Sequence, residues 1–228
     1  MDTPEKSRQL AEKMVRIGNL SGKRFSALIT DMDQPLGNYI GNALEVEEAI
    51  GILSGRMGGD LRDVSLSLGA HILKNAGAAE SLTAGRELLE QKLDSGEGLR
   101  KLADMIRAQG GDPRVTEDVS LLPKAKSHVE LKADADGYLG RICTSDVGNA
   151  AKLLGAGREK KTDIIDPAVG IVMHKRIGDR VRRGESLCTL HVGEHSDRIG
   201  AYNLLKRALV IGKEPVQKPP LVHAVVEA

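Results

Sequence analysis

The stretch "RFSALITDMDQPLGNYIGNALEVEEAI" (residues 24–50) joins a short apolar run to a Pro-Leu-Gly turn and an acidic helix start. A continuous apolar run without alternating polar residues is typical of a strand that is covered on both faces, as in a parallel sheet. A helical pattern precedes this run and several follow it. We therefore predict an α/β fold in which part of a mixed or parallel sheet is layered with helices.

The segment "TPEKSRQLAEKMVRIG" (residues 3–18) is predicted to be a helix that leads into this strand. Its threonine suits the N-cap position and its proline suits the first helical position. Leu10, Met14 and Ile17 form one apolar face, and Gly18 is predicted to end the helix. Four further helical patterns, each closed by glycine, cover residues 43–55, 60–77, 82–96 and 97–111.

The pattern changes after "GGDPRV" (residues 110–115). Residues 128–143 and 170–192 alternate and carry Asp-Gly, Gly-Asp and Arg-Gly turn signals, which indicate β-structure. Residues 145–157 and 197–212 are predicted to be helices. We place a boundary near residue 127, so that residues 1–126 form the α/β part and residues 127–228 form a smaller α+β module.

The composition argues against several classes of partner. Thirty-three Lys and Arg residues balance 32 Asp and Glu residues, so a formal charge of +1 gives no reason to expect nucleic acid or an acidic membrane as partner. One Phe, three Tyr and no Trp leave few stacking platforms for single-stranded nucleic acid. No apolar stretch reaches the ~20 residues that cross a bilayer, and the polar N-terminus does not resemble a signal peptide. A cytoplasmic protein is predicted.

Two cysteines, Cys143 and Cys188, lie outside any CxxC or zinc-type spacing and are predicted to be reduced structural thiols. His191 and His195 have i, i+4 spacing, but a glycine separates them in what should be a strand end, so a shared metal is not favoured. His71 is predicted to be a hydrogen-bonded core residue.

Two carboxylates follow the apolar run, where open α/β sheets bind their ligands. Asp31 and Asp33 are two residues apart, so in an extended chain they point the same way and could act as metal ligands or as an acid/base couple. The alternative is that one caps the next turn and the other binds a basic group. Glu48, beyond the helix start, could add a carboxylate to carbonyls of the tight Pro-Leu-Gly turn, a donor set that suits a hard cation.

A glycine-rich segment, "LLGAGREKK" (residues 153–161), is the best local candidate for a phosphate cradle. Gly155 and Gly157 flank a turn, and three basic residues follow. The alternative, which we favour, is a helix C-cap followed by a solvated basic loop.

Two long motifs resemble one known family. "ITDMDQPLGNYIGNALEVEEAI" (residues 29–50) and "LLGAGREKKTDIIDPAVGIVMHKRIGDRVRRGESLCTLH" (residues 153–191) are similar to the C-terminal half of the pyrimidine-nucleoside and thymidine phosphorylases. The resemblance extends over essentially the whole chain. It implies a family that uses phosphate to displace the base from a thymidine or uridine nucleoside, giving the pentose 1-phosphate, and that works as a homodimer.

The resemblance also implies a structural monovalent cation, usually potassium. In the family, two backbone carbonyls of the turn and a glutamate of the next helix bind it; the matching positions here are Leu36, Tyr39 and Glu48. The remaining family ligands come from a glycine/threonine stretch of the N-terminal half, which is absent from this sequence. The site is therefore expected to be partial.

The family's phosphate loop, of the type Lys-His-Ser-Thr-Gly-Gly, and its base-binding residues are also absent. Met1 aligns with a methionine internal to the family pattern, so we expect the second half of a split or shortened phosphorylase, inactive without a complementary N-terminal half. Preference for thymidine over uridine is not encoded here, because base selectivity belongs to the absent half. The rival hypothesis is a non-catalytic binding or assembly protein that keeps the fold.

The segment "GDRVRRGESLCTLH" (residues 178–191) also looks like the turn region of biotinyl and lipoyl carrier domains, whose barrel-sandwich-like β-structure recurs at the end of this family. A carrier needs a lysine at the tip of an exposed hairpin, whereas Lys175 precedes the Gly-Asp turn. The module is predicted to be structural.

Overall fold

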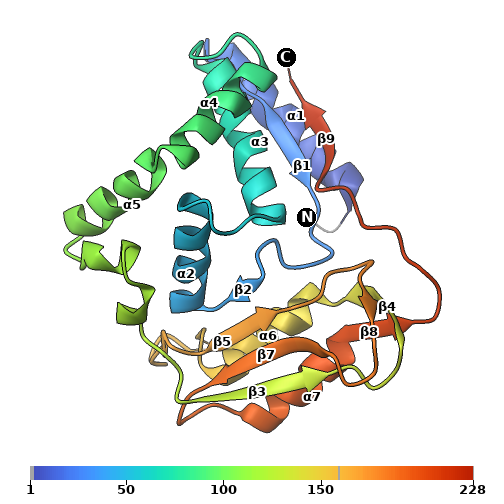
Figure 1. Ribbon diagram of the computed structural model, residues 1–228. Helices are drawn as coiled ribbons and strands as arrows, with labels where there is room; N and C mark the ends of the chain where they lie inside the picture. The colour runs from blue at the N-terminus through green and yellow to red at the C-terminus, as the bar shows by residue number, and fades with distance from the viewer. Residues whose placement is uncertain (1–2, 159, 228) are drawn as a thin grey trace. The chain divides into compact units, whose positions relative to one another are not determined.

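The computed structural model describes residues 3–158 and 160–227, which form two compact units (Figure 1). The chain passes from one unit to the other four times along its length. The predicted boundary at residue 127 falls inside unit 2. Unit 1 contains the described residues of Met1–Asp31, Ser54–Gly98 and Pro220–Ala228, and unit 2 contains those of Met32–Leu53 and Leu99–Pro219.

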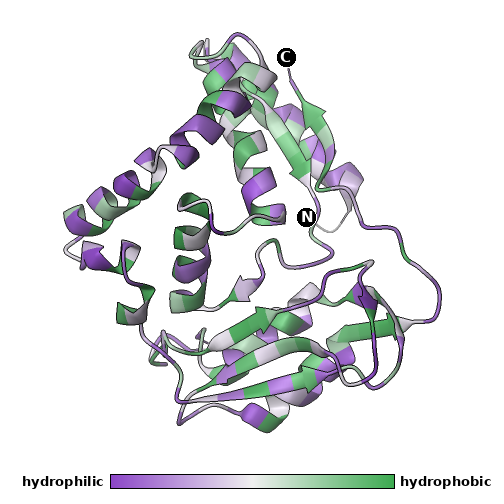
Figure 2. Cartoon of the chain, in the orientation of Figure 1, coloured by the Kyte–Doolittle hydropathy of each residue, from purple (hydrophilic) through white to green (hydrophobic). Residues whose placement is uncertain are grey.

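Unit 1 is a two-stranded antiparallel sheet with three helices. The two strands are formed mostly by hydrophobic residues (Figure 2). Helices α3 and α4 pack closely, because glycine at position 85 brings α4 within contact distance of the Ala70 backbone. The elements are α1 (Pro4–Leu20), β1 (Ala27–Thr30), α3 (Asp60–Asn75), α4 (Leu82–Asp94) and β9 (Val222–Val226).

Helix α1 begins as predicted but buries a different face. Thr3 accepts a hydrogen bond from the backbone amide of Lys6 at 3.3 Å, as an N-cap does. The prediction that Gly18 ends the helix is wrong, since the helix runs to Leu20. Glycine is needed there for another reason: a Cβ atom would lie 2.2 Å from the ring of Phe25.

The face of α1 that is buried contains small residues, Ala11, Val15 and Gly18. The predicted apolar face is exposed, with Leu10 at 44%, Met14 at 53% and Ile17 at 65% of their full accessibility; Leu20, near its end, is also exposed.

Every strand pair among the described residues is antiparallel, so the expected parallel or mixed sheet is not found in this part of the chain. Strand β1 pairs with β9, which returns from the far end of the sequence, and Leu28 lies opposite Val225. The apolar run of β1 was correctly interpreted as a strand, but local sequence carries no information on a partner about 195 residues away.

Unit 2 contains two antiparallel sheets, of strand order β2-β5-β7-β3 and β6-β4-β8. Its core is one aliphatic cluster in which Leu139, Ile171, Leu190 and Leu205 are fully buried. Helices α6 and α7 pack on each other. The elements are β2 (Tyr39–Ile40), α2 (Asn42–Leu53), α5 (Glu97–Ala108), η1 (Pro113–Thr116), η2 (Val119–Leu121), β3 (Ser127–Lys132), β4 (Gly137–Ile142), α6 (Thr144–Leu154), β5 (Gly170–Met173), β6 (Arg180–Val181), β7 (Ser186–Val192), α7 (Arg198–Ala208) and β8 (Leu209–Gly212).

The four helical patterns between residues 43 and 111 are confirmed as α2 to α5. The prediction of one helix over residues 197–212 is wrong at its end, because the chain becomes extended at Leu209 and pairs with β4. Val210 and Ile211 are β-branched and favour this strand. No helix in the described part of the chain combines the length and the apolar character needed to span a membrane.

Candidate functional site

The loop of residues 34–41 includes the short strand β2 and leads into α2 within unit 2. Gln34 is buried, and its Oε1 accepts a hydrogen bond of 3.1 Å from the backbone amide of Ile177. Gly41 has a φ of 142°, and its amide donates to Glu45 Oε1 at 3.2 Å at the start of α2. A Cβ on Gly41 would lie 2.5 Å from the carbonyl oxygen of Val169, so glycine permits close approach of the two strands here.

Glu48 is the centre of this loop and is only 3% exposed. Its Oε1 accepts from the amide of Asn38 at 2.8 Å and its Oε2 accepts from the amide of Tyr39 at 3.2 Å. Gly37 makes this approach possible, because a Cβ there would lie 2.3 Å from Glu48 Oε2. Two backbone donors therefore hold the buried carboxylate.

Arg176 approaches the same loop, and its guanidinium donates to backbone oxygens. Nη2 lies 3.4 Å from the carbonyl oxygen of Leu36, and Nη1 lies 3.3 Å from that of Gly37. Nη1 also lies 3.4 Å from Asn38 Oδ1. The amides of the loop thus bind an anion, Glu48, while its carbonyls bind a cation, Arg176.

The three groups implied as cation ligands are near one another in sequence and loop, but they do not form a complete site. Hard cations take about six to eight oxygen ligands. Leu36 and Tyr39 would each supply one carbonyl oxygen, and Glu48 would supply its carboxylate. The carbonyl of Leu36 already accepts from Arg176. The orphaned buried atom of this loop, Gln34 Nε2, is a donor and cannot coordinate a cation. Among the described residues, these three groups therefore leave the oxygen shell of a cation incomplete.

Burial raises the pKa of the Tyr39 phenol, and the carboxylates of Glu47 and Glu48 raise it further. The phenol therefore stays protonated and neutral beside the loop. Its backbone carbonyl, rather than its hydroxyl, is the group that the resemblance implies as a ligand.

The two aspartates of the opening stretch have different surroundings. Asp31 has a side chain that is 7% exposed, and its Oδ1 lies 3.1 Å from His223 Nε2. Asp33 is exposed. For Asp31 the structure thus agrees with the second interpretation, a carboxylate that binds a basic group, and the residue has a partner that sequence reasoning missed.

Three histidines lie near one another on the sheet formed by β3, β5 and β7. His128 and His191 are directly opposite on β3 and β7, with ring centroids 4.4 Å apart and nearly perpendicular planes. His174 Nε2 lies 2.8 Å from Thr189 Oγ1. Burial lowers the pKa of His191 to about 4, with further contributions from His128, Lys124 and His174. No group of three His, Cys, Asp or Glu residues within 3–158 and 160–227 is placed to hold a metal ion.

The glycine-rich segment at residues 153–157 ends a helix. Gly155 has a φ of 106° and is the C-cap of α6, where its amide donates to the carbonyl of Lys152 and that of Ala156 donates to Ala151. The C-cap interpretation is confirmed. Because a helix C-terminus carries partial negative charge, this turn repels an anion rather than cradling it.

Other candidate groups have structural partners. Lys175 lies 2.5 Å from Glu185 Oε1, and this contact lowers the pKa of Glu185. The side chain of Lys175 is only 18% exposed, whereas a carrier lysine stands exposed at a hairpin tip. Burial raises the pKa of Cys188 to about 12, so this thiol stays protonated.

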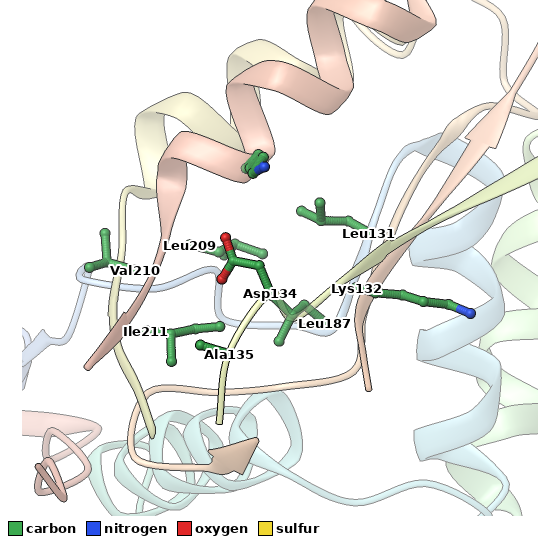
Figure 3. Close-up of a pocket in the computed structure, with 9 residues that line it drawn as sticks. Leu131, Lys132, Asp134, Ala135, Leu187, Leu209, Val210 and Ile211 are labelled. Atoms are coloured by element: carbon green, nitrogen blue, oxygen red, sulfur yellow. The ribbon is translucent and has the colours of Figure 1, made fainter. Parts of the chain in front are cut away.

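A cavity of about 280 Å³ opens in unit 2 between β3, the start of β7 and β8. Figure 3 shows Asp134 directing its carboxylate into this space between apolar side chains, while Lys132 extends away. Its volume is at the low end for ligand pockets. Lys206 also lines it, but the Asp134 carboxylate that points into the space disfavours an anion such as phosphate.

Known proteins resemble both parts of the chain. Residues 2–99 match the family model "Glycosyl transferase family, a/b domain", and residues 138–212 match "Pyrimidine nucleoside phosphorylase C-terminal domain". The pyrimidine-nucleoside phosphorylase of Staphylococcus aureus (strain bovine RF122 / ET3-1) is 43% identical over 226 residues, which are 99% of this chain and 52% of that relative. The enzyme of strain COL is 42% identical over the same shares.

The chain belongs to the pyrimidine-nucleoside phosphorylase family. It spans about half the length of the curated relatives that it matches. Arg176, which contacts the 34–41 loop, could not be found from the sequence. Its position directly before "IGD" gives no signal for a contact with a loop about 140 residues away.

Proposed function

We propose that this chain is the C-terminal portion of a pyrimidine-nucleoside phosphorylase and takes part in reversible phosphorolysis of thymidine or uridine. The observation that carries the proposal is an identity of 43% maintained over 99% of the chain. In the reaction, a phosphate oxygen bonds to C1′ of the pentose while the bond from C1′ to the base nitrogen breaks. The products are the pentose 1-phosphate and the free base.

The role we propose for the chain is to build and hold one wall of the nucleoside cleft. Phosphorolysis needs donors around the phosphate and a donor that stabilises the departing base. The best glycine-rich candidate for a phosphate cradle in the sequence, within residues 153–161, forms the C-terminal end of helix α6. Phosphate and base are therefore proposed to bind to the half of the enzyme that this sequence does not span.

We further propose that a monovalent cation, potassium, binds beside the 34–41 loop only in the assembled enzyme. Leu36, Tyr39 and Glu48 would supply part of its oxygen shell, and the other half would supply the rest. The carbonyl of Leu36, which now accepts from Arg176, would use its second lone pair for the cation. The assembled enzyme is proposed to be a homo-oligomer.

Mixing the two halves tests this function. The chain is assayed with thymidine or uridine and inorganic phosphate, alone and after co-expression with the half of the Staphylococcus aureus relative that the match does not cover. Release of free base is followed in each case. Activity that appears only with both halves supports the proposal. Absence of activity with a verified two-part complex contradicts it and favours a non-catalytic assembly protein.

A further inference from the structure

The cavity of about 280 Å³ in unit 2, which we call the β3–β8 cavity, has no role in the proposed chemistry. Two edge strands line it, because β3 ends one sheet of this unit and β8 ends the other. Its volume admits only a small molecule. The described residues that line it include no aromatic side chain on which a pyrimidine could stack, so a nucleoside is a poor fit.

Aliphatic side chains make up most of the wall of the β3–β8 cavity. Leu131 on β3, Leu187 on β7 and Leu209 at the start of β8 are buried and line it. Val210 and Ile211, which follow on β8, line it as well and are less buried. A branched aliphatic group placed against this wall would leave water, which favours its binding.

Two opposite charges adjoin this apolar wall. Figure 3 shows the carboxylate of Asp134, in the turn between β3 and β4, directed into the cavity. Lys206, in the last turn of α7, also lines it. Neither side chain forms an ion pair or a hydrogen bond within residues 3–158 and 160–227, so the two charged groups lie beyond ion-pair distance of each other. Both are therefore available to a ligand.

The charges and the apolar wall together select the class of ligand. A simple anion would be repelled by Asp134, and an uncharged apolar molecule would leave both charges unused. Lys132 does not change this balance, because it extends away from the cavity in Figure 3 and its Nζ lies 3.1 Å from Glu130. A small molecule that carries an ammonium group, a carboxylate and an aliphatic group satisfies all three features.

We propose that the β3–β8 cavity binds a free aliphatic α-amino acid such as leucine. Asp134 accepts hydrogen bonds from the ammonium group of the ligand, and Lys206 donates to its carboxylate. The leucine side chains of the wall hold the aliphatic group. The inference does not rest on the proposed function, because no residue of this cavity takes part in the proposed phosphorolysis.

Titration of the chain with L-leucine tests the proposal. Backbone-amide NMR shifts of residues 131–135 and 206–211 follow the binding. We expect a saturable change with a dissociation constant of about 1–10 mM, because the ligand is small and the cavity is open to solvent. Three further ligands each lack one feature of leucine: isoamylamine lacks the carboxylate, isocaproate lacks the ammonium group, and glycine lacks the aliphatic side chain. Each should bind more weakly than L-leucine.

Asp134→Asn and Lys206→Gln each remove one of the two charges. Both side chains are exposed and without partners among the described residues, so the chain keeps its fold, which far-UV circular dichroism checks. Each variant should weaken L-leucine binding about threefold to fivefold, as the loss of an exposed ion pair does. Lys213→Gln and Glu214→Gln are the matched controls, because these exposed residues just beyond β8 do not line the cavity. They should leave binding unchanged.

The absence of a saturable change with L-leucine overturns the proposal. Binding of isoamylamine, isocaproate or glycine as tight as that of L-leucine overturns it too, as does unchanged binding in both cavity variants. Base release by the two-part enzyme is a separate measurement. Its absence contradicts the proposed function and leaves the amino-acid site standing, whereas base release without leucine binding does the reverse.

Discussion

Glu48→Gln removes the charge from the buried carboxylate that organises the 34–41 loop. The substitution keeps the size and shape of the side chain. One of its two terminal atoms becomes an NH₂ group, which cannot accept a hydrogen bond. Either Asn38 N, now 2.8 Å from Oε1, or Tyr39 N, now 3.2 Å from Oε2, loses its acceptor.

The loss is large because the site is almost closed to water. Hydrogen bonds to a charged group contribute about 1.5–3 kcal/mol each, and an unsatisfied buried donor costs about 1–3 kcal/mol. Both amides are only partly buried, which reduces the penalty. We expect Glu48→Gln to lower the free energy of unfolding of the chain by about 2–3 kcal/mol.

Urea unfolding followed by far-UV circular dichroism measures this change, since the chain has no tryptophan for fluorescence. Glu47→Gln is the matched control, one residue earlier on the same helix. The side chain of Glu47 is 30% exposed, and its Oε2 lies 3.5 Å from Lys124 Nζ. A surface pair of this kind contributes about 0–1 kcal/mol.

Equal losses for the two variants would refute the reasoning, because they would show that the amide contacts of Glu48 stabilise nothing. Stabilisation by Glu48→Gln would refute it as well. Slower hydrogen exchange of the loop amides in the variant would point the same way.

Three further outcomes are expected. The pKa of His191 is about 4, against an ordinary 6.5, so the unfolded chain takes up a proton before the folded chain does as the pH falls. The free energy of unfolding should therefore drop between about pH 6.5 and 4. Urea unfolding at pH 4 and pH 7 should show that His191→Gln makes this drop smaller by about 1–2 kcal/mol. Gly170→Ala places a Cβ 2.2 Å from the carbonyl oxygen of Ile40 at a φ of 156°, so we expect it to lower the free energy of unfolding by about 2–4 kcal/mol. Gly148→Ala lies in α6 with open space around it, and should raise the free energy of unfolding by about 0.5–1 kcal/mol. Replacing choline by potassium should leave the Tm of the chain alone unchanged, and a specific rise with potassium would show that this half holds the cation without help.

Most local structure could be predicted from the sequence, because helical periodicity and glycine positions are local signals. Helix α1 shows the limit. Its larger apolar residues, Leu10, Met14 and Ile17, formed the obvious face, yet the buried face contains Ala11 and Val15. Periodicity shows which residues share a face of a helix, but not which face meets the sheet.

The candidate site shows a second limit. The resemblance pointed to Leu36 and Tyr39 in the 34–41 loop. The sequence also placed Glu48 next to this loop, and the structure shows its carboxylate bound to the loop amides. The contact of Arg176 with the carbonyls of Leu36 and Gly37, and the opposition of His128 and His191, depend on long-range packing and strand register. Nothing in the local composition specifies either.

Binding of inorganic phosphate to the chain alone tests the account most directly. Isothermal titration calorimetry up to millimolar phosphate measures it, with the two-part complex as the positive control. We expect no saturable heat from the chain alone and a single phosphate site per complex. The central claim is that this half of the enzyme does not bind the attacking phosphate by itself. Saturable binding by the isolated chain, together with release of base from thymidine or uridine, would contradict it.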